Sequence, residues 1–140
     1  MPLYLDTSAI VPLLTDEPFS ARAQALLAAR REEIIVSDFG AAEYSSAMAR
    51  LVRIGVITPE EARLSFDSYD QWQDHAARHV GMDPADIRAA TRFVRSLDFS
   101  LRAPDAIHIA IALRLGATLV TFDRQMAAAA GALGVTVADI

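Results

Sequence analysis

Short apolar runs alternate with longer segments of helical periodicity along the whole chain, and this alternation restricts the fold more than any other feature. Strands that alternate with helices pair in parallel, and the connecting helices pack on the faces of the sheet. The sequence therefore predicts an α/β fold with three layers, α/β/α, around a small four- or five-stranded parallel sheet. The expected strands cover residues Leu3–Asp6, Ile34–Ser37, Thr118–Phe122 and Val135–Val137.

The helices expected between these strands begin at clear start signals. Thr58-Pro59-Glu60-Glu61 and Asp83-Pro84-Ala85-Asp86 each supply an N-cap, a proline at the first helical position and an acid at the third. Gly55 suits the end of the preceding helix. The segment Ala77–Met82 fits either a strand or the end of a helix. The expected helices are Ser8–Leu14, Ser20–Ala29, Phe39–Ile54, Pro59–His75, Pro84–Leu97, Pro104–Leu115 and Gln125–Leu133.

The size and composition of the chain indicate its class. A length of 140 residues is typical of one domain, so we expect a single domain over residues 1–140. No apolar stretch approaches the ~20 residues that span a bilayer, and Met1-Pro2 leads into a strand without a basic region or a cleavage site. The absence of cysteine fits a reducing compartment. These features predict a cytoplasmic protein that does not enter a membrane.

Four acidic residues lie where strands give way to helices. Asp6 and Asp123 close two expected strands, and Glu43 and Asp105 lie in the first turns of two helices. The carboxyl ends of parallel strands line one edge of a sheet, where ligands bind, so we expect these side chains to converge. Two carboxylates about 4 Å apart repel by on the order of 4 kcal/mol at an effective dielectric near 20. A cation or a proton must therefore be present.

Each of these acids also has a simpler interpretation. Asp6 and Asp123 could serve only as helix caps, and Glu43 and Asp105 could serve only as favourable charges near helix dipoles. However, the expected helix Pro104–Leu115 is apolar nearly all round, so it would bury Asp105. A buried, unpaired carboxylate is costly unless it binds a cation or a proton. Oxygen ligands without cysteine or histidine favour Mg²⁺ or Mn²⁺, which suit phosphodiester hydrolysis.

The basic residues limit the possible chemistry. All 13 are arginines, so Schiff-base chemistry is excluded. The net charge of −5 argues against a protein that coats nucleic acid, although bound divalent ions would offset much of it. Arg102 and Arg124 flank the expected acidic edge and are candidates for phosphate contacts. We interpret Arg88, Arg92 and Arg95 as a solvated helix face rather than as an RNA track.

Two further features have structural interpretations. His108 lies three residues after Asp105, on a nearby helix face, and we interpret it as a packing or hydrogen-bonding histidine rather than as a metal ligand. Trp72, Phe66 and Tyr69 follow helical spacing, which indicates either core packing or a dimer contact.

Four short motifs occur in order and almost from end to end of the chain. They are Leu5-Asp6-Thr7-Ser8-Ala9, Ala42-Glu43-Tyr44, Arg102-Ala103-Pro104-Asp105-Ala106-Ile107-His108-Ile109-Ala110 and Val120-Thr121-Phe122-Asp123-Arg124. Any one of them is a weak signal, but four in sequence within a stand-alone domain are a strong one. Together they resemble the motifs of PIN-domain ribonucleases, and specifically the small VapC-type toxins.

The resemblance implies a site, a reaction and partners. It implies that Asp6, Glu43, Asp105 and Asp123 hold one or two Mg²⁺ or Mn²⁺ ions, with Ser8 or Thr121 supplying a nearby hydroxyl. The implied reaction is endonucleolytic hydrolysis of RNA. Family members are typically homodimers, and each is neutralised by a cognate antitoxin protein whose C-terminal segment lies over the active-site groove.

Three alternatives belong to other classes. A catalytically silent PIN-like module would bind RNA or a protein without cutting it. A receiver would accept a phosphoryl group on an aspartate that ends the first strand, but receivers use a lysine near the last strand, and this chain has none. Haloacid-dehalogenase-like phosphatases require a second acid two residues after the first, where this chain has Ser8.

Overall fold

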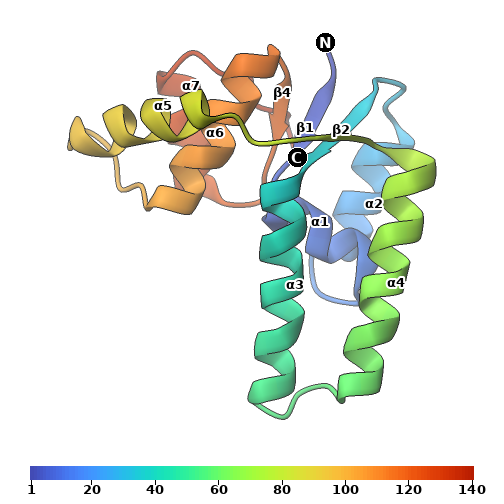
Figure 1. The fold of residues 1–140 in the computed structure, drawn as a ribbon. Coiled ribbons are helices and arrows are strands. Elements are labelled where there is room, and N and C mark those ends of the chain that lie inside the picture. The colour runs from blue at the N-terminus through green and yellow to red at the C-terminus, as the bar shows by residue number, and fades with distance from the viewer.

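The computed structural model describes residues 1–140 and confirms the predicted three-layer α/β fold, with one parallel sheet in the order β3-β2-β1-β4 (Figure 1). The strands are β1 (Leu3–Leu5), β2 (Ile34–Ser37), β3 (Arg78–Val80) and β4 (Thr118–Val120). The helices are α1 (Thr7–Leu14), α2 (Ser20–Ala28), α3 (Asp38–Arg53), α4 (Pro59–Ala76), α5 (Pro84–Arg95), α6 (Ala103–Leu115) and α7 (Arg124–Ala132). None of the seven helices combines the length and the apolarity that a membrane span requires.

The sheet divides the interior into two cores because successive strand residues point to opposite faces. Leu3 and Leu5 lie in one core with side chains of α1, α3 and α4, whereas Tyr4 lies in the other with side chains of α6 and α7. All three residues are completely buried, and burying one large apolar side chain contributes about 1.5–3 kcal/mol. Figure 1 shows the two groups of helices on either side of the strands.

The order of the strands creates a crevice at the end of β1. The chain passes from β1 to β2 and then to β3 on one side, and it returns to place β4 on the other side of β1. Ligands bind at such a switch point, outside the carboxyl ends of the strands. Asp6 directly follows β1, and Asp123 lies three residues beyond the end of β4. The topology therefore directs both residues to the same end of the sheet.

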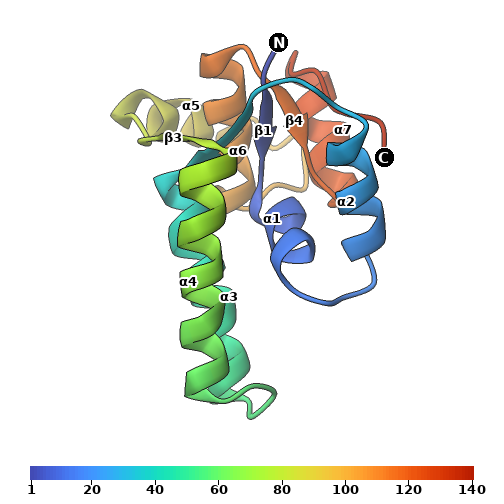
Figure 2. The same cartoon turned by 90° about the vertical axis from the view of Figure 1, so that its right-hand side faces the viewer.

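Helices α3 and α4 form a hairpin that extends away from the sheet (Figures 1 and 2). Gly55 has a φ of +77°, which is the left-handed conformation that commonly follows a helix C-terminus. The predicted capping box of α4 is present: Glu61 N donates to Thr58 Oγ1 over 3.1 Å, and Thr58 N donates to Glu61 Oε1 over 3.2 Å. Local capping therefore fixes this boundary without help from the sheet.

The predicted strand ends were partly wrong. The first and fourth strands end at Leu5 and Val120, because the residues that follow turn to place Asp6 and Asp123 at helix N-caps. The expected strand Val135–Val137 is reduced to a single bridge between Val137 and Leu119. The segment Ala77–Met82, which fitted either a strand or the end of a helix, contains β3, an edge strand that pairs in parallel with β2. Helix α5 ends at Arg95 rather than Leu97, whose φ of 62° is incompatible with a helix.

Candidate active site

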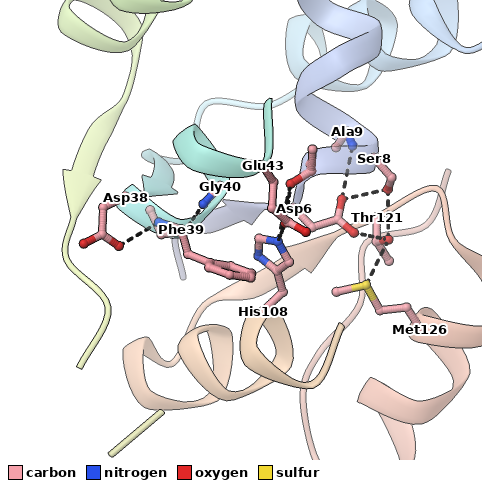
Figure 3. Close-up of polar contacts among 12 residues, drawn as sticks. Asp6, Ser8, Ala9, Asp38, Phe39, Gly40, Glu43, His108, Thr121 and Met126 are labelled. Atoms are coloured by element: carbon pink, nitrogen blue, oxygen red, sulfur yellow. Dashed lines mark hydrogen bonds and ion pairs between the residues drawn. The ribbon is translucent and has the colours of Figure 1, made fainter. Parts of the chain in front are cut away.

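Asp6 is the most enclosed of the four predicted acids. It is only 3% exposed and caps α1. Its Oδ1 accepts hydrogen bonds from Ser8 Oγ at 2.7 Å and Ala9 N at 3.1 Å, and its Oδ2 accepts one from Thr121 Oγ1 at 2.6 Å (Figure 3). Burial raises the pKa of Asp6 above its ordinary value, although these donors act in the opposite direction. The carboxylate is therefore held in one orientation.

Ser8 and Thr121 connect the ends of β1 and β4. Their hydroxyl oxygens lie 3.1 Å apart. Phe122 N donates to Ser8 Oγ over 2.9 Å, and Asp123 N donates to Thr121 Oγ1 over 3.1 Å. The structure therefore brings both predicted hydroxyls to Asp6, where they also fix the turn that leads to Asp123.

Asp123 is a helix cap at the mouth of the same region. Its Oδ1 accepts a hydrogen bond from Met126 N at 3.0 Å, at the start of α7. Its other oxygen accepts no hydrogen bond from the protein. Capping thus engages half of the Asp123 carboxylate and leaves the other half for a ligand.

Asp105 is the third residue of α6, and its side chain is 20% exposed. The expectation that this helix buries Asp105 is met only in part, because the first turn of α6 reaches solvent although the middle of the helix does not. Burial, followed by the charge of Asp123 and that of Glu43, raises the pKa of Asp105, while Arg102 opposes the shift. Asp105 thus lies in the negative field of two other predicted site residues.

Glu43 lies in the second turn of α3, one turn later than predicted. Its Oε1 accepts a hydrogen bond from Thr7 Oγ1 at 2.6 Å. The same oxygen forms a short contact with His108 Nε2 (Figure 3). Burial acts to raise the pKa of Glu43, but the hydrogen bonds from His108 and Thr7 outweigh it, and the net shift is downward. Glu43 is therefore held in its charged form.

His108 is the centre of a buried hydrogen-bond chain. It is 3% exposed, and its Nδ1 lies 2.7 Å from the hydroxyl of Tyr4. That hydroxyl lies 2.9 Å from Ser37 Oγ. The chain Ser37–Tyr4–His108–Glu43 therefore joins β2, β1, α6 and α3, and the interpretation of His108 as a hydrogen-bonding residue agrees with its contacts.

Sequence reasoning did not identify Tyr4, Thr7 or Ser37 as members of the site. One signal was available for Tyr4, because a tyrosine inside an apolar strand carries a hydroxyl that needs a partner when it is buried. The partner itself could not be inferred, because His108 lies 104 residues away along the chain.

The arginines near the edge remain open to solvent. The side chain of Arg102 is 85% exposed, and its Nε lies 3.9 Å from Asp105 Oδ2. Arg124 is the exposed first residue of α7. Arg88, Arg92 and Arg95 are all exposed on α5 and form no ion pair.

Among the aromatic residues of α4, Tyr69 lies in the core, and its ring centroid is 6.1 Å from that of Trp72.

The four carboxylates do not form a closed ligand cage. No group of three or more histidine, aspartate or glutamate side chains lies in a geometry that could hold a metal ion. Asp6 and Glu43 point toward protein donors instead. The donor chemistry nevertheless fits Mg²⁺ or Mn²⁺, because every candidate ligand is a carboxylate oxygen. Burial and then the charges of Asp123 and Glu43 raise the pKa of Asp105, and a bound cation would offset those charges.

Comparisons with known proteins place this geometry in a family. The family model described as "PIN domain" matches residues 3–132. A relative from Mycobacterium tuberculosis, Ribonuclease VapC46, is 34% identical over 140 residues, covering 96% of this chain and 95% of the relative.

Solved structures show the same fold at lower identity. The sarcin-ricin loop cleaving toxin VapC20 of Mycobacterium tuberculosis superposes with a TM-score of 0.74 at 16% identity, covering 99% of both chains. A chain of a toxin-antitoxin complex from Klebsiella pneumoniae superposes with a TM-score of 0.60 at 16% identity, covering 91% of both chains. The matched length, the four motifs in order and the shared fold together lead to one conclusion: the chain belongs to the PIN domain family, and its relatives there are VapC proteins.

Proposed function

We propose that this protein is a metal-dependent endoribonuclease that hydrolyses RNA phosphodiester bonds and acts as the toxin of a toxin-antitoxin pair. The observation that carries the proposal is the placement of Asp6 and Asp123 just beyond the ends of the neighbouring strands β1 and β4, with Asp105 in the electrostatic field of Asp123 and Glu43. The relative named Ribonuclease VapC46 spans nearly the whole chain, which supports the same activity.

In this proposal, Asp6, Asp105, Asp123 and Glu43 hold one or two Mg²⁺ or Mn²⁺ ions. When bound, such an ion supplies a Lewis acid that polarises the phosphoryl group and offsets its developing charge. Ser8 and Thr121 keep the Asp6 carboxylate oriented through hydrogen bonds of 2.7 and 2.6 Å. Arg102 and Arg124 are exposed at the same edge and would contact RNA phosphates.

Glu43 has a role set by its partners. Thr7 and His108 lower its pKa, whereas burial and the charges of Asp123 and Glu43 raise the pKa of Asp105. It would therefore provide a permanent negative charge, either to hold an ion directly or to orient a water bound there.

Removal of the metal should abolish cleavage. We expect EDTA to stop the cutting of a fluorescently labelled RNA on a denaturing gel, and added Mg²⁺ or Mn²⁺ to restore it. Asp105→Asn should raise the Mn²⁺ concentration that gives half-maximal activity by about tenfold or more, because it removes one charge from the ligand set. Cleavage that persists in excess EDTA would contradict the proposal, and would instead require a reaction without a metal.

Replacing His108 should weaken the reaction without removing a ligand. We expect His108→Gln to lower kcat about 10- to 100-fold, the usual effect of losing a residue that orients a metal ligand. Tyr4→Phe removes only the next link, through a 2.7 Å hydrogen bond, and should have a smaller effect in the same direction.

The readout that separates positioning from simple destabilisation is metal affinity. Mn²⁺ binding, followed by isothermal titration calorimetry, should weaken in His108→Gln at a temperature where circular dichroism shows both proteins folded. If kcat and Mn²⁺ affinity are both unchanged in His108→Gln, the buried hydrogen-bond chain through Tyr4 and His108 serves packing alone.

We also propose two partners. One is a cognate antitoxin protein, which the fold shared with a chain of the Klebsiella pneumoniae toxin-antitoxin complex supports. The other is a second copy of the chain, which light scattering would detect as a mass of twice 15.2 kDa.

The competing function is a PIN-like module that binds RNA or protein without cutting. A preparation that binds Mn²⁺ and RNA but leaves the RNA intact would favour that alternative.

A further inference from the structure

Two phenylalanines from distant parts of the chain stack beside the acidic edge. Phe19 is the residue at the N-cap position of α2, and Phe122 lies in the turn between β4 and Asp123. Their ring centroids are 4.9 Å apart with an interplanar angle of 24°. Phe19 is 39% exposed, so part of its side chain faces solvent. The exposed part of an aromatic ring can stack on a ligand.

A guanidinium group lies against this stack. Arg22 Cζ is 5.7 Å from the centroid of Phe19 and 5.8 Å from that of Phe122, both within the range of a cation–π interaction. Arg22 and Arg124 are exposed, and neither forms an ion pair or a hydrogen bond through its side chain. Two exposed arginines without an ion pair therefore line the same hollow as Asp123, in a chain whose net charge is −5.

The stack is the common wall of two hollows that both reach Asp123. One, of about 190 Å³, is lined by Phe19, Phe122 and Asp123 together with Arg22 and Arg124. The other, of about 390 Å³, is lined by the same three residues together with the polar residues Thr7 and Ser8 and the acidic Glu17, so the arginines lie in the first hollow only. A ligand that crosses the acidic edge would thus meet aromatic rings and two guanidinium groups on its way.

This combination matches the chemistry of a single-stranded nucleotide. A guanidinium group contacts phosphate, and an aromatic ring stacks on a base. Resting on the proposed function, we propose that Phe19, Phe122 and Arg22 form a subsite for the nucleotide next to the cleaved phosphodiester, with Arg124 contacting its phosphate. The rings require an unstacked base, so the subsite selects single-stranded RNA over a duplex. An acidic peptide would use the arginines but would gain little from the rings.

RNA affinity in the absence of metal tests the subsite separately from cleavage. The probe is a fluorescein-labelled RNA hexamer of mixed sequence, and its binding is measured by fluorescence anisotropy in EDTA. The salt concentration is about 50 mM, because low salt strengthens phosphate contacts. We expect Phe19→Leu, which keeps an apolar side chain but removes the ring, to raise the Kd for the hexamer about fivefold or more. Phe19→Trp keeps an aromatic ring and should bind the hexamer with the affinity of the parent. A hexamer whose bases are removed should bind parent and Phe19→Leu equally.

Arg22→Gln tests the phosphate contact by a different observable. It should reduce the slope of log Kd against log salt by about 0.7, the value for one phosphate contact on a single strand. Arg95→Gln is the matched control, because Arg95 is exposed on α5 without an ion pair and its loss changes the net charge equally. Leu64→Ala, at a side chain that is 67% exposed on α4, controls for the loss of surface apolar area.

The outcomes separate this inference from the proposed function. If Phe19→Leu and Arg22→Gln bind the hexamer as the parent does, with the same salt slope, the subsite is overturned even when the parent cleaves RNA. If the parent binds the hexamer with the expected losses in the variants but does not cleave RNA with Mg²⁺ or Mn²⁺, the subsite stands and the proposed function fails.

Discussion

Asp6→Asn should abolish RNA cleavage without destabilising the fold. We expect the rate to fall on the order of a hundredfold or more, because a lost metal ligand removes several kcal/mol of charge stabilisation and each 1.36 kcal/mol is a factor of ten. Expression of the variant should no longer inhibit growth. Asparagine is nearly isosteric and caps helices as well as aspartate does, so the contact with Ala9 N is preserved.

The stability of the same variant gives a second, opposite signal. Because burial raises the pKa of Asp6, the folded protein disfavours its charged form. A neutral side chain removes that cost, so the Tm in EDTA at neutral pH should equal or exceed that of the parent. Added Mg²⁺ should raise the Tm of the parent more than that of the variant, since a ligand stabilises the state that binds it.

The matched control is Asp83→Asn, which replaces an N-cap aspartate of α5 that makes no contact with the site. It should retain full cleavage activity. If Asp6→Asn cleaves RNA at more than about a tenth of the parental rate, the assignment of Asp6 is wrong. If its Tm in EDTA falls by many degrees, Asp6 is mainly a structural cap.

Among the substitutions proposed for this chain, Arg114→Met should produce the largest loss in the free energy of unfolding. Asp86 is 2% exposed and accepts hydrogen bonds from Arg114 Nε at 2.8 Å and Nη2 at 2.9 Å. Arg114 Nη2 also donates to Gly81 O over 3.2 Å, so one guanidinium joins α5, α6 and the segment after β3. Without it, a carboxylate stays buried without a cation, and breaking such a pair costs 3–5 kcal/mol.

We expect a loss of about 3 kcal/mol in the free energy of unfolding, near the lower end of that range because the Arg114 side chain is 33% exposed. Urea denaturation would measure it. Arg95→Met, on the exposed face of α5, should change stability by no more than about 0.5 kcal/mol. The double variant Asp86→Leu with Arg114→Met should recover part of the loss, because it leaves no unpaired charge. A loss equal to that of Arg95→Met would show that the pair contributes little.

The helix boundaries were the most predictable part of the fold, because capping is local. Thr58 and Asp83 each lie within three residues of the donors and acceptors that they satisfy, and both predicted capping boxes are present. Strand β3 was less predictable. Arg78 and His79 are exposed and show no apolar pattern, and they are extended because they pair with Ile35 and Val36 of β2, more than 40 residues away.

The candidate site divides in the same way. The sequence alone indicated four acids at strand-to-helix junctions, and the resemblance of its motifs to those of PIN-domain ribonucleases indicated Ser8 and Thr121. It did not reveal that Phe19 stacks on Phe122, nor that Tyr4 reaches Ser37 and His108. These pairs are set by which helix covers which face of the sheet.

Local patterns of apolar and capping residues thus determined the helices and the positions of the acids relative to them, because both depend on neighbours within a turn of helix. The tertiary structure decided how each acid is held: Asp6 by two hydroxyls, Glu43 by a buried histidine, and Asp105 in the field of Asp123. Burial and long-range hydrogen bonds change the pKa of a carboxylate, and both exist only after distant segments have come together.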